Sequence, residues 1–118
     1  MKRILLLLLL CSTTLLMAQQ TDPIQEAMAS YDYETALSLI AQKKPATPLL
    51  LQKGKALRSL GLNAEALSTY QEIIGKDSTN TRALIEAAEC CRTLAKYKQA
   101  SAYYEKVLDL TPENKYVR

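Results

Sequence analysis

Few residues of this 118-residue chain are suited to chemistry, and the most reactive are the adjacent thiols of Cys90 and Cys91. Consecutive Cα atoms lie about 3.8 Å apart, which is closer than an ordinary disulfide requires. We therefore expect two small apolar side chains that fill space within a helix. The alternative is an intermolecular disulfide or a redox site in an oxidising compartment.

The residues that other kinds of catalysis require are missing from this chain. The chain has no His, so neither a Ser–His nor a Cys–His pair can form within it. No cluster has zinc-type spacing, and no Gly-rich loop could bind phosphate. We predict no enzyme, no cofactor, no metal and no small-molecule substrate. An enzymatic alternative would need a further domain beyond Arg118 to supply a general base.

The composition points to helices and away from nucleic acid. The chain has three Gly and neither Phe nor Trp, while Ala and Leu are abundant, which favours an all-helical protein. Its 15 basic residues oppose 12 acidic ones and form no basic block. Nucleic acid is therefore not an expected partner.

The first residues, "MKRILLLLLLCSTTLLMAQQ", have the order of a secretory signal peptide: a basic start, an apolar run and small residues. The apolar stretch 4–18 has 15 residues, fewer than the roughly 20 that a membrane span needs. We predict a signal peptide over 1–18, cleaved after Ala18, and export of residues 19–118 to the periplasm or the medium. Removing Lys2 and Arg3 from the 15 basic residues leaves 13 against 12 acidic residues, a net charge of +1.

A second interpretation of this segment makes Cys11 the lipid-anchored first residue of a lipoprotein. Such signals require a small residue before the cysteine, whereas here Leu10 precedes it. The cleaved signal peptide is therefore the preferred prediction.

An internal repeat dominates the rest of the chain. The segment "EALSTYQEII" (65–74) returns as "QASAYYEKVL" (99–108), so that Ala66 matches Ala100 and Tyr70 matches Tyr104. A fixed period of this length is typical of stacked helical repeats.

Each period contains two predicted helices. One spans 48–60, with Pro48 in its first turn and Gly61 as its stop signal. A second begins near Asn63 and ends at Gly75, and the segments "TRALIEAAECCRTLA" and "YKQASAYYEKVLDL" repeat this pair. Turn and cap residues at 77–80 and 111–114 follow the second helices.

Small residues recur where antiparallel helices would approach closely, with a Tyr beside each contact. Neighbouring pairs must then stack, because one pair cannot bury its apolar face alone. The predicted packing residues are Gly54, Ala66, Tyr70, Ala88, Ala100 and Tyr104.

These residues resemble the tetratricopeptide repeat (TPR) family. The third unit carries its pattern as Leu84, Ala87, Ala88, Cys91, Tyr97, Ala100, Tyr104 and Pro112. The sequence departs from the family pattern at three positions. In the second unit, Lys53 replaces a Leu and Ser78 replaces the Pro, and in the third unit Cys91 replaces an aromatic residue. An earlier unit, Tyr33-x2-Ala36-x3-Ile40, lies closer to the next than the regular period would place it. The resemblance covers 23–114 and implies an all-α, right-handed α-solenoid of about three helix-turn-helix repeats, with units 23–46, 47–80 and 81–114.

The resemblance also implies a site, because this family binds peptides on a concave face lined by the first helix of each unit. The implied groove residues are Leu51, Lys55, Arg58, Arg82, Ile85, Glu89 and Arg92. Four basic residues against one acidic residue favour an acidic or C-terminal segment, and ordinary solvated charges are the alternative. Leu51 and Lys55 stand where the family's carboxylate clamp has Lys and Asn, so we do not predict chaperone-tail binding.

The last residues, "ENKYVR", resemble the start of another helix. Three expectations remain open: exposed apolar surface, self-association through an uncapped C-terminal end, or a longer protein of which this is a fragment. We predict a non-enzymatic exported scaffold that binds a protein or peptide segment. The alternative is a structural assembly component, or the N-terminal fragment of a larger TPR protein, in a bacterial envelope complex.

Overall fold

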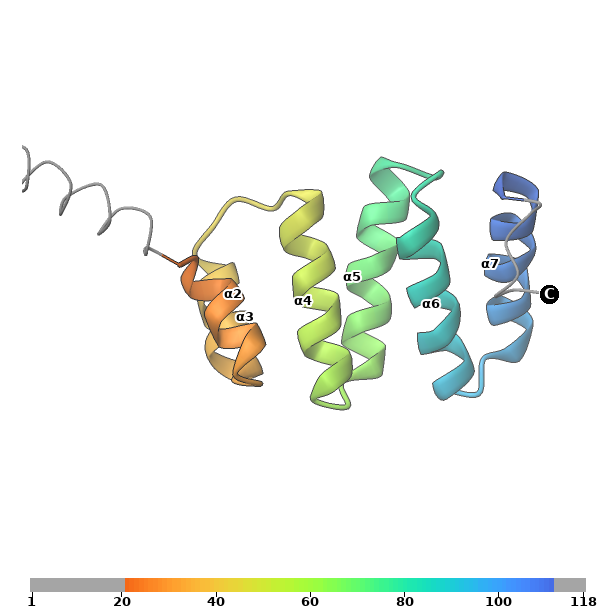
Figure 1. Cartoon of the computed structure of the whole chain (residues 1–118). Helices are drawn as coiled ribbons and strands as arrows, with labels where there is room; N and C mark the ends of the chain where they lie inside the picture. Colours follow the sequence, from red (N-terminus) through yellow and green to blue (C-terminus); the bar gives the residue numbers. More distant parts are fainter. Residues whose placement is uncertain (1–20, 112–118) are drawn as a thin grey trace, which may run out of the picture.

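A computed structural model describes residues 21–111, and within them the chain is a row of antiparallel helices without a strand (Figure 1). The helices are α2 (Pro23–Ala29), α3 (Tyr33–Ala41), α4 (Thr47–Ser59), α5 (Asn63–Lys76), α6 (Thr81–Thr93) and α7 (Tyr97–Leu110). Each packs mainly against its neighbours in sequence. The predicted all-α solenoid of helix-turn-helix repeats is confirmed. The predicted signal peptide, Cys11 and the segment 112–118 lie outside the described residues.

Side-chain caps and prolines define where several helices begin. Asp22, Asp32 and Asn80 each accept a hydrogen bond from a backbone N–H in the first turn, at 3.0, 3.2 and 3.0 Å, which satisfies a donor that has no partner within the helix. Pro23 and Pro48 occupy first turns, where a missing N–H does no harm. The helix predicted over 48–60 is observed at Thr47–Ser59.

The turn within each helix pair reverses the chain through a left-handed residue. Tyr31, Gly61 and Ala95 have φ of 62°, 78° and 61°. In each turn the next residue's N–H donates to the carbonyl five residues back, at 2.8, 2.8 and 2.7 Å, which is the Schellman pattern of a helix end. The predicted stop at Gly61 is confirmed. In the other two pairs, Tyr31 and Ala95 adopt the same left-handed conformation although each carries a Cβ.

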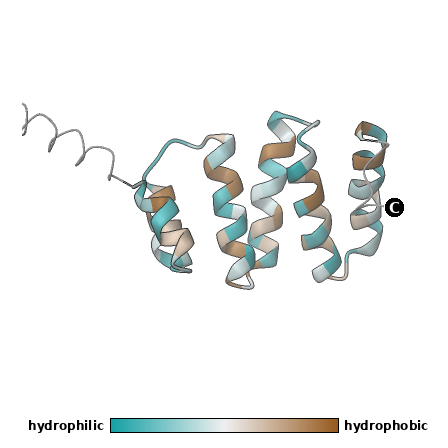
Figure 2. Cartoon of the chain, in the orientation of Figure 1, coloured by the Kyte–Doolittle hydropathy of each residue, from teal (hydrophilic) through white to brown (hydrophobic). Residues whose placement is uncertain are grey.

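The core lies between consecutive helices, and apolar and polar residues alternate along each helix (Figure 2). Gly54 shows how tightly α4 packs on α5, because a Cβ added there would collide with Cζ of Tyr70. The aromatic ring therefore lies directly over the glycine. Tyr70 itself is 1% exposed.

Cys90 and Cys91 are both buried on α6 and carry free thiols. The prediction that they fill space is confirmed. Burial raises the pKa of the Cys90 thiol to about 11, so a reactive thiolate is scarce at neutral pH. Within residues 21–111 no helix is both long and apolar enough to cross a membrane.

Candidate peptide-binding face

The first helix of each pair contributes to one shared hollow, although these helices are far apart in sequence. Its volume is about 260 Å³. It is lined by Gln25 and Met28 of α2, Leu51, Gln52 and Lys55 of α4, and Arg82 of α6. We call it the first-helix groove. The structure thus brings together three of the predicted groove residues, Leu51, Lys55 and Arg82.

A second hollow adjoins the groove and shares Lys55 with it. Its volume is about 400 Å³. The lining residues are Lys55, Arg58, Ser59, Asn63, Glu86 and Thr93. Three of the predicted groove residues, Ile85, Glu89 and Arg92, line neither hollow. Ile85 is half-buried on α6.

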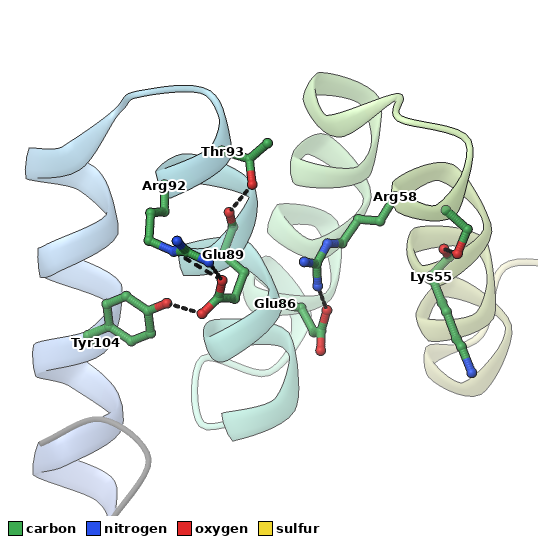
Figure 3. A network of polar contacts seen from close by, with 8 residues as sticks. Lys55, Arg58, Glu86, Glu89, Arg92, Thr93 and Tyr104 are labelled. Atoms are coloured by element: carbon green, nitrogen blue, oxygen red, sulfur yellow. Dashed lines mark hydrogen bonds and ion pairs between the residues drawn. The ribbon is translucent and has the colours of Figure 1, made fainter.

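Arg58 of α4 is paired with a residue of α6, the first helix of the next pair. Its guanidinium donates a hydrogen bond to the carboxylate of Glu86, and the two side chains form an ion pair (Figure 3). Both side chains are partly buried, at 31% and 26% exposure. The sequence interpretation missed Glu86. The signal for it was its position, between Arg82 and Glu89 at helical spacing on one face.

Arg92 is also occupied, in a small network with Glu89 and Tyr104 (Figure 3). It donates to Glu89 Oε2 at 2.6 Å, and the Tyr104 hydroxyl donates to Glu89 Oε1 at 2.5 Å. The bonds from Tyr104 and then Arg92 hold the pKa of the Glu89 carboxyl below its ordinary value, because they favour the charged form. Arg92 remains largely exposed on the surface.

These pairings change the expected charge of the face. Sequence reasoning gave four basic residues against one acidic residue, whereas the structure adds Glu86 and neutralises both Arg58 and Arg92. Lys55 and Arg82 form no ion pair with any other described residue. The basic character of the face is therefore concentrated at these two side chains.

The predicted packing residues divide into two groups. Five are buried: Gly54, Ala66, Tyr70, Ala88 and Ala100. Tyr104 is only partly buried, because its hydroxyl reaches Glu89 at the surface. The repeat pattern predicted equal roles for Tyr70 and Tyr104, and the structure shows that these roles differ.

No three potential ligands among His, Cys, Asp and Glu gather into a metal site in residues 21–111. Every buried side-chain nitrogen or oxygen there has a hydrogen-bond partner.

Comparisons with known proteins agree with this architecture. Residues 81–114 match the family described as Tetratricopeptide repeat. The comparison with curated proteins gave no match.

Several solved structures share the fold. PcrH, from Pseudomonas aeruginosa, in complex with the chaperone-binding region of PopB is 19% identical, with a TM-score of 0.70 and 80% of each chain covered. The first TPR of Spaghetti (RPAP3), bound to the HSP90 peptide SRMEEVD, is 22% identical, with a TM-score of 0.72 and coverage of 80% of this chain and 78% of that one. The Arabidopsis OM64 TPR domain is 18% identical, with a TM-score of 0.72 and coverage of 80% and 82%. The described residues therefore form a helical-repeat array of the TPR type.

Proposed function

We propose that this chain is a non-enzymatic scaffold that binds a segment of another protein in the first-helix groove. The observation that carries the proposal is that α2, α4 and α6 line a single hollow. A segment lying across three helices can contact several units at once. Two of the similar structures hold such segments, from PopB and from HSP90, which supports the capacity of the fold for this role.

The lining residues indicate the chemistry of the segment. Met28 and Leu51 offer apolar contact, while Gln25 and Gln52 can hydrogen-bond to a peptide backbone. Lys55 and Arg82 can each bind a carboxylate through charge-assisted hydrogen bonds. We infer a ligand that carries an apolar side chain and at least one nearby carboxylate, either an acidic side chain or a C-terminus.

Arg58 and Arg92 have a different role in this proposal. Each is already bonded to a glutamate, so its charge is partly offset and its side chain is already held in position. We therefore assign them to the shape and rigidity of the face. Lys55 and Arg82 are assigned to ligand binding.

The test is a selection of binding peptides from a displayed random library, followed by affinity measurements. Lys55→Glu combined with Arg82→Glu should weaken the selected peptides about tenfold or more. The matched control is Lys98→Glu with Lys106→Glu, which makes the same charge change at exposed residues of α7. Equal losses in both variants, or no loss in either, would refute the assignment.

We also propose that the scaffold is exported, on the basis of the signal-peptide pattern in 1–18. The mass of the protein purified from its own host tests this proposal. A chain that begins at Gln19 agrees with cleavage and export. A chain that retains Met1 contradicts export, and lipid on Cys11 would replace free export by membrane anchoring.

A further inference from the structure

A third hollow lies at the junction of α3 and α4, away from the first-helix groove. Its volume is about 300 Å³. The apolar part of its wall includes Leu37, Ile40 and Ala41 of α3, Pro45, and Leu49 and Leu50 of α4. It shares no lining residue with the first-helix groove. We call it the α3–α4 hollow.

The hollow exists because α3 is short. It has 9 residues, whereas α5 and α7 each have 14. Pro45 removes a backbone N–H and disfavours helical conformation at the residue before it, so the chain cannot continue α3 across the junction. The five missing residues (14 minus 9) correspond to about 7.5 Å of helix.

The register between units shows what the missing turns would have supplied. In the second unit, Ile73 is buried between α5 and α6, and Ile74 is partly buried beside it. The offset that aligns Ala36 with Ala66 places Lys43 at the position of Ile73 and Lys44 at that of Ile74. Two aliphatic side chains that fill one junction are thus replaced by two lysines at the other.

The α4 wall of the hollow also differs from its counterpart in the next unit. The regular period, which aligns Leu50 with Leu84, makes Leu49 and Lys53 of α4 correspond to Ala83 and Ala87 of α6. Both alanines are completely buried in the filled junction. Leu49 and Lys53, by contrast, are only partly buried and line the hollow.

The charge at this hollow has one sign. Lys43, Lys44 and Lys53 line it, no acidic residue does, and none of the three forms an ion pair with another described residue. An apolar wall edged by three cations complements an aliphatic group flanked by several carboxylates.

We propose that the α3–α4 hollow is a second binding site, which takes a helical, acidic segment of a protein partner. Two adjacent aliphatic side chains of that segment occupy the space that Ile73 and Ile74 fill in the next unit. Its Asp or Glu residues pair with Lys43, Lys44 and Lys53. The partner thereby completes the turns that α3 lacks.

Two other occupants fit less well. Residues 112–118 of a second copy carry one acidic and two basic residues, which is the wrong charge for a site with three lysines. A small amphiphile, such as a fatty acid, brings a single carboxylate and leaves the other lysines unpaired. A segment with several carboxylates matches all three.

The probe is a short synthetic peptide, acetylated and amidated, in which an Ile–Ile pair is flanked by glutamates in a helix-forming sequence. It is titrated by fluorescence anisotropy against the protein produced from its complete sequence. We expect Lys43→Glu with Lys44→Glu to weaken binding about tenfold or more. Lys98→Glu with Lys106→Glu on α7, the matched control, should leave binding unchanged.

A second variant tests the same idea by filling the hollow with protein. Replacing residues 41–46 by the sequence of 71–80 lengthens the chain and gives α3 the end of α5, including the Ile–Ile pair. We expect this variant to melt at a higher temperature and to lose the peptide. Unchanged binding to it would overturn the proposal.

Control probes identify the occupant. A peptide with a Ser–Ser pair, or with lysines in place of the glutamates, should not bind. The proposal is wrong if these peptides bind equally, if dodecanoate binds while the acidic peptide does not, or if the wild-type protein dimerises through this hollow and excludes the peptide.

Discussion

The α5–α6 and α3–α4 junctions are built on the same plan and differ in one respect. At the first, Ile73 is buried between the helices and the space is filled. At the second, α3 ends early and a hollow of about 300 Å³ remains, edged by lysines. The fold tolerates both because each helix packs mainly on its neighbours in sequence, as expected of a quasi-one-dimensional array. A repeat protein can thus leave one junction incompletely filled without losing the packing of the others.

The largest difference between the two junctions should appear when one side chain is truncated at each of them. Ile73→Ala removes a completely buried side chain and should lower the free energy of unfolding by about 2–5 kcal/mol. Leu49→Ala removes a partly exposed side chain at the hollow and should cost about 1 kcal/mol. Urea unfolding of both variants measures the difference. Equal losses would mean that the two junctions are packed alike.

Enlarging a residue should have opposite consequences in filled and open parts of the molecule. Ala100 is 4% exposed in the core of α7, and Ala100→Leu should destabilise by about 1–3 kcal/mol through overpacking. Ala41 lines the hollow and is exposed, so Ala41→Leu should be neutral or slightly stabilising. Thermal melts of the two variants give the comparison. A neutral Ala100→Leu would show that the helix pairing around this residue is wrong.

The turns within the pairs give a smaller effect, which should be similar in every unit. Ala95 has φ of 61°, a conformation that costs about 1–2 kcal/mol for a residue with a Cβ. Ala95→Gly should therefore stabilise the fold by about 0.5 kcal/mol, after the entropy that glycine adds to the unfolded chain. Gly61→Ala, at a φ of 78°, is the reverse control and should destabilise. Equilibrium unfolding curves decide the sign of each change.

Acidification should give the smallest effect, and it isolates the Glu89 network. Since the folded pKa of Glu89 lies below its ordinary value of 4.5, its bonds to Tyr104 and Arg92 stabilise the fold above pH 4.5. That contribution is lost as the pH falls through the lower, folded pKa. When the pH is lowered from neutral to below 4.5, the free energy of unfolding should therefore fall less for Glu89→Gln than for the wild type. Glu105→Gln, which removes an exposed carboxylate on the outermost described helix, should behave like the wild type.

The sequence predicted the fold well because its signals are local and repeated. Ala66 and Tyr70, with their counterparts Ala100 and Tyr104, define two helix pairs, and Gly61 defines a turn. The early end of α3 was also predictable, from Pro45 and from the shortened spacing between the first two units. What the spacing did not reveal is the hollow, because its volume depends on how α4 packs beside the shortened helix.

The candidate site was harder to predict, because charges pair across helices. Arg58 and Glu86 are 28 residues apart in sequence and form a hydrogen bond between α4 and α6. Helical spacing indicates which residues share a face, but it does not show which neighbouring helix supplies the partner. Tyr104 illustrates the same limit, since its match to Tyr70 suggested a buried ring rather than a hydroxyl bonded to Glu89.

The most direct test of the proposed function is a map of backbone amide shifts in the protein upon titration with a library-selected peptide. Binding in the first-helix groove predicts the largest shifts at Gln25, Leu51 and Arg82, on three helices that are adjacent only in the folded array. Reaching these shifts should take about tenfold more peptide, or a larger excess, in the Lys55→Glu, Arg82→Glu variant, and no more than for the wild type in the α7 control. Shifts confined to α5 and α7, with none on α2, α4 or α6, would contradict a peptide-binding role for this face.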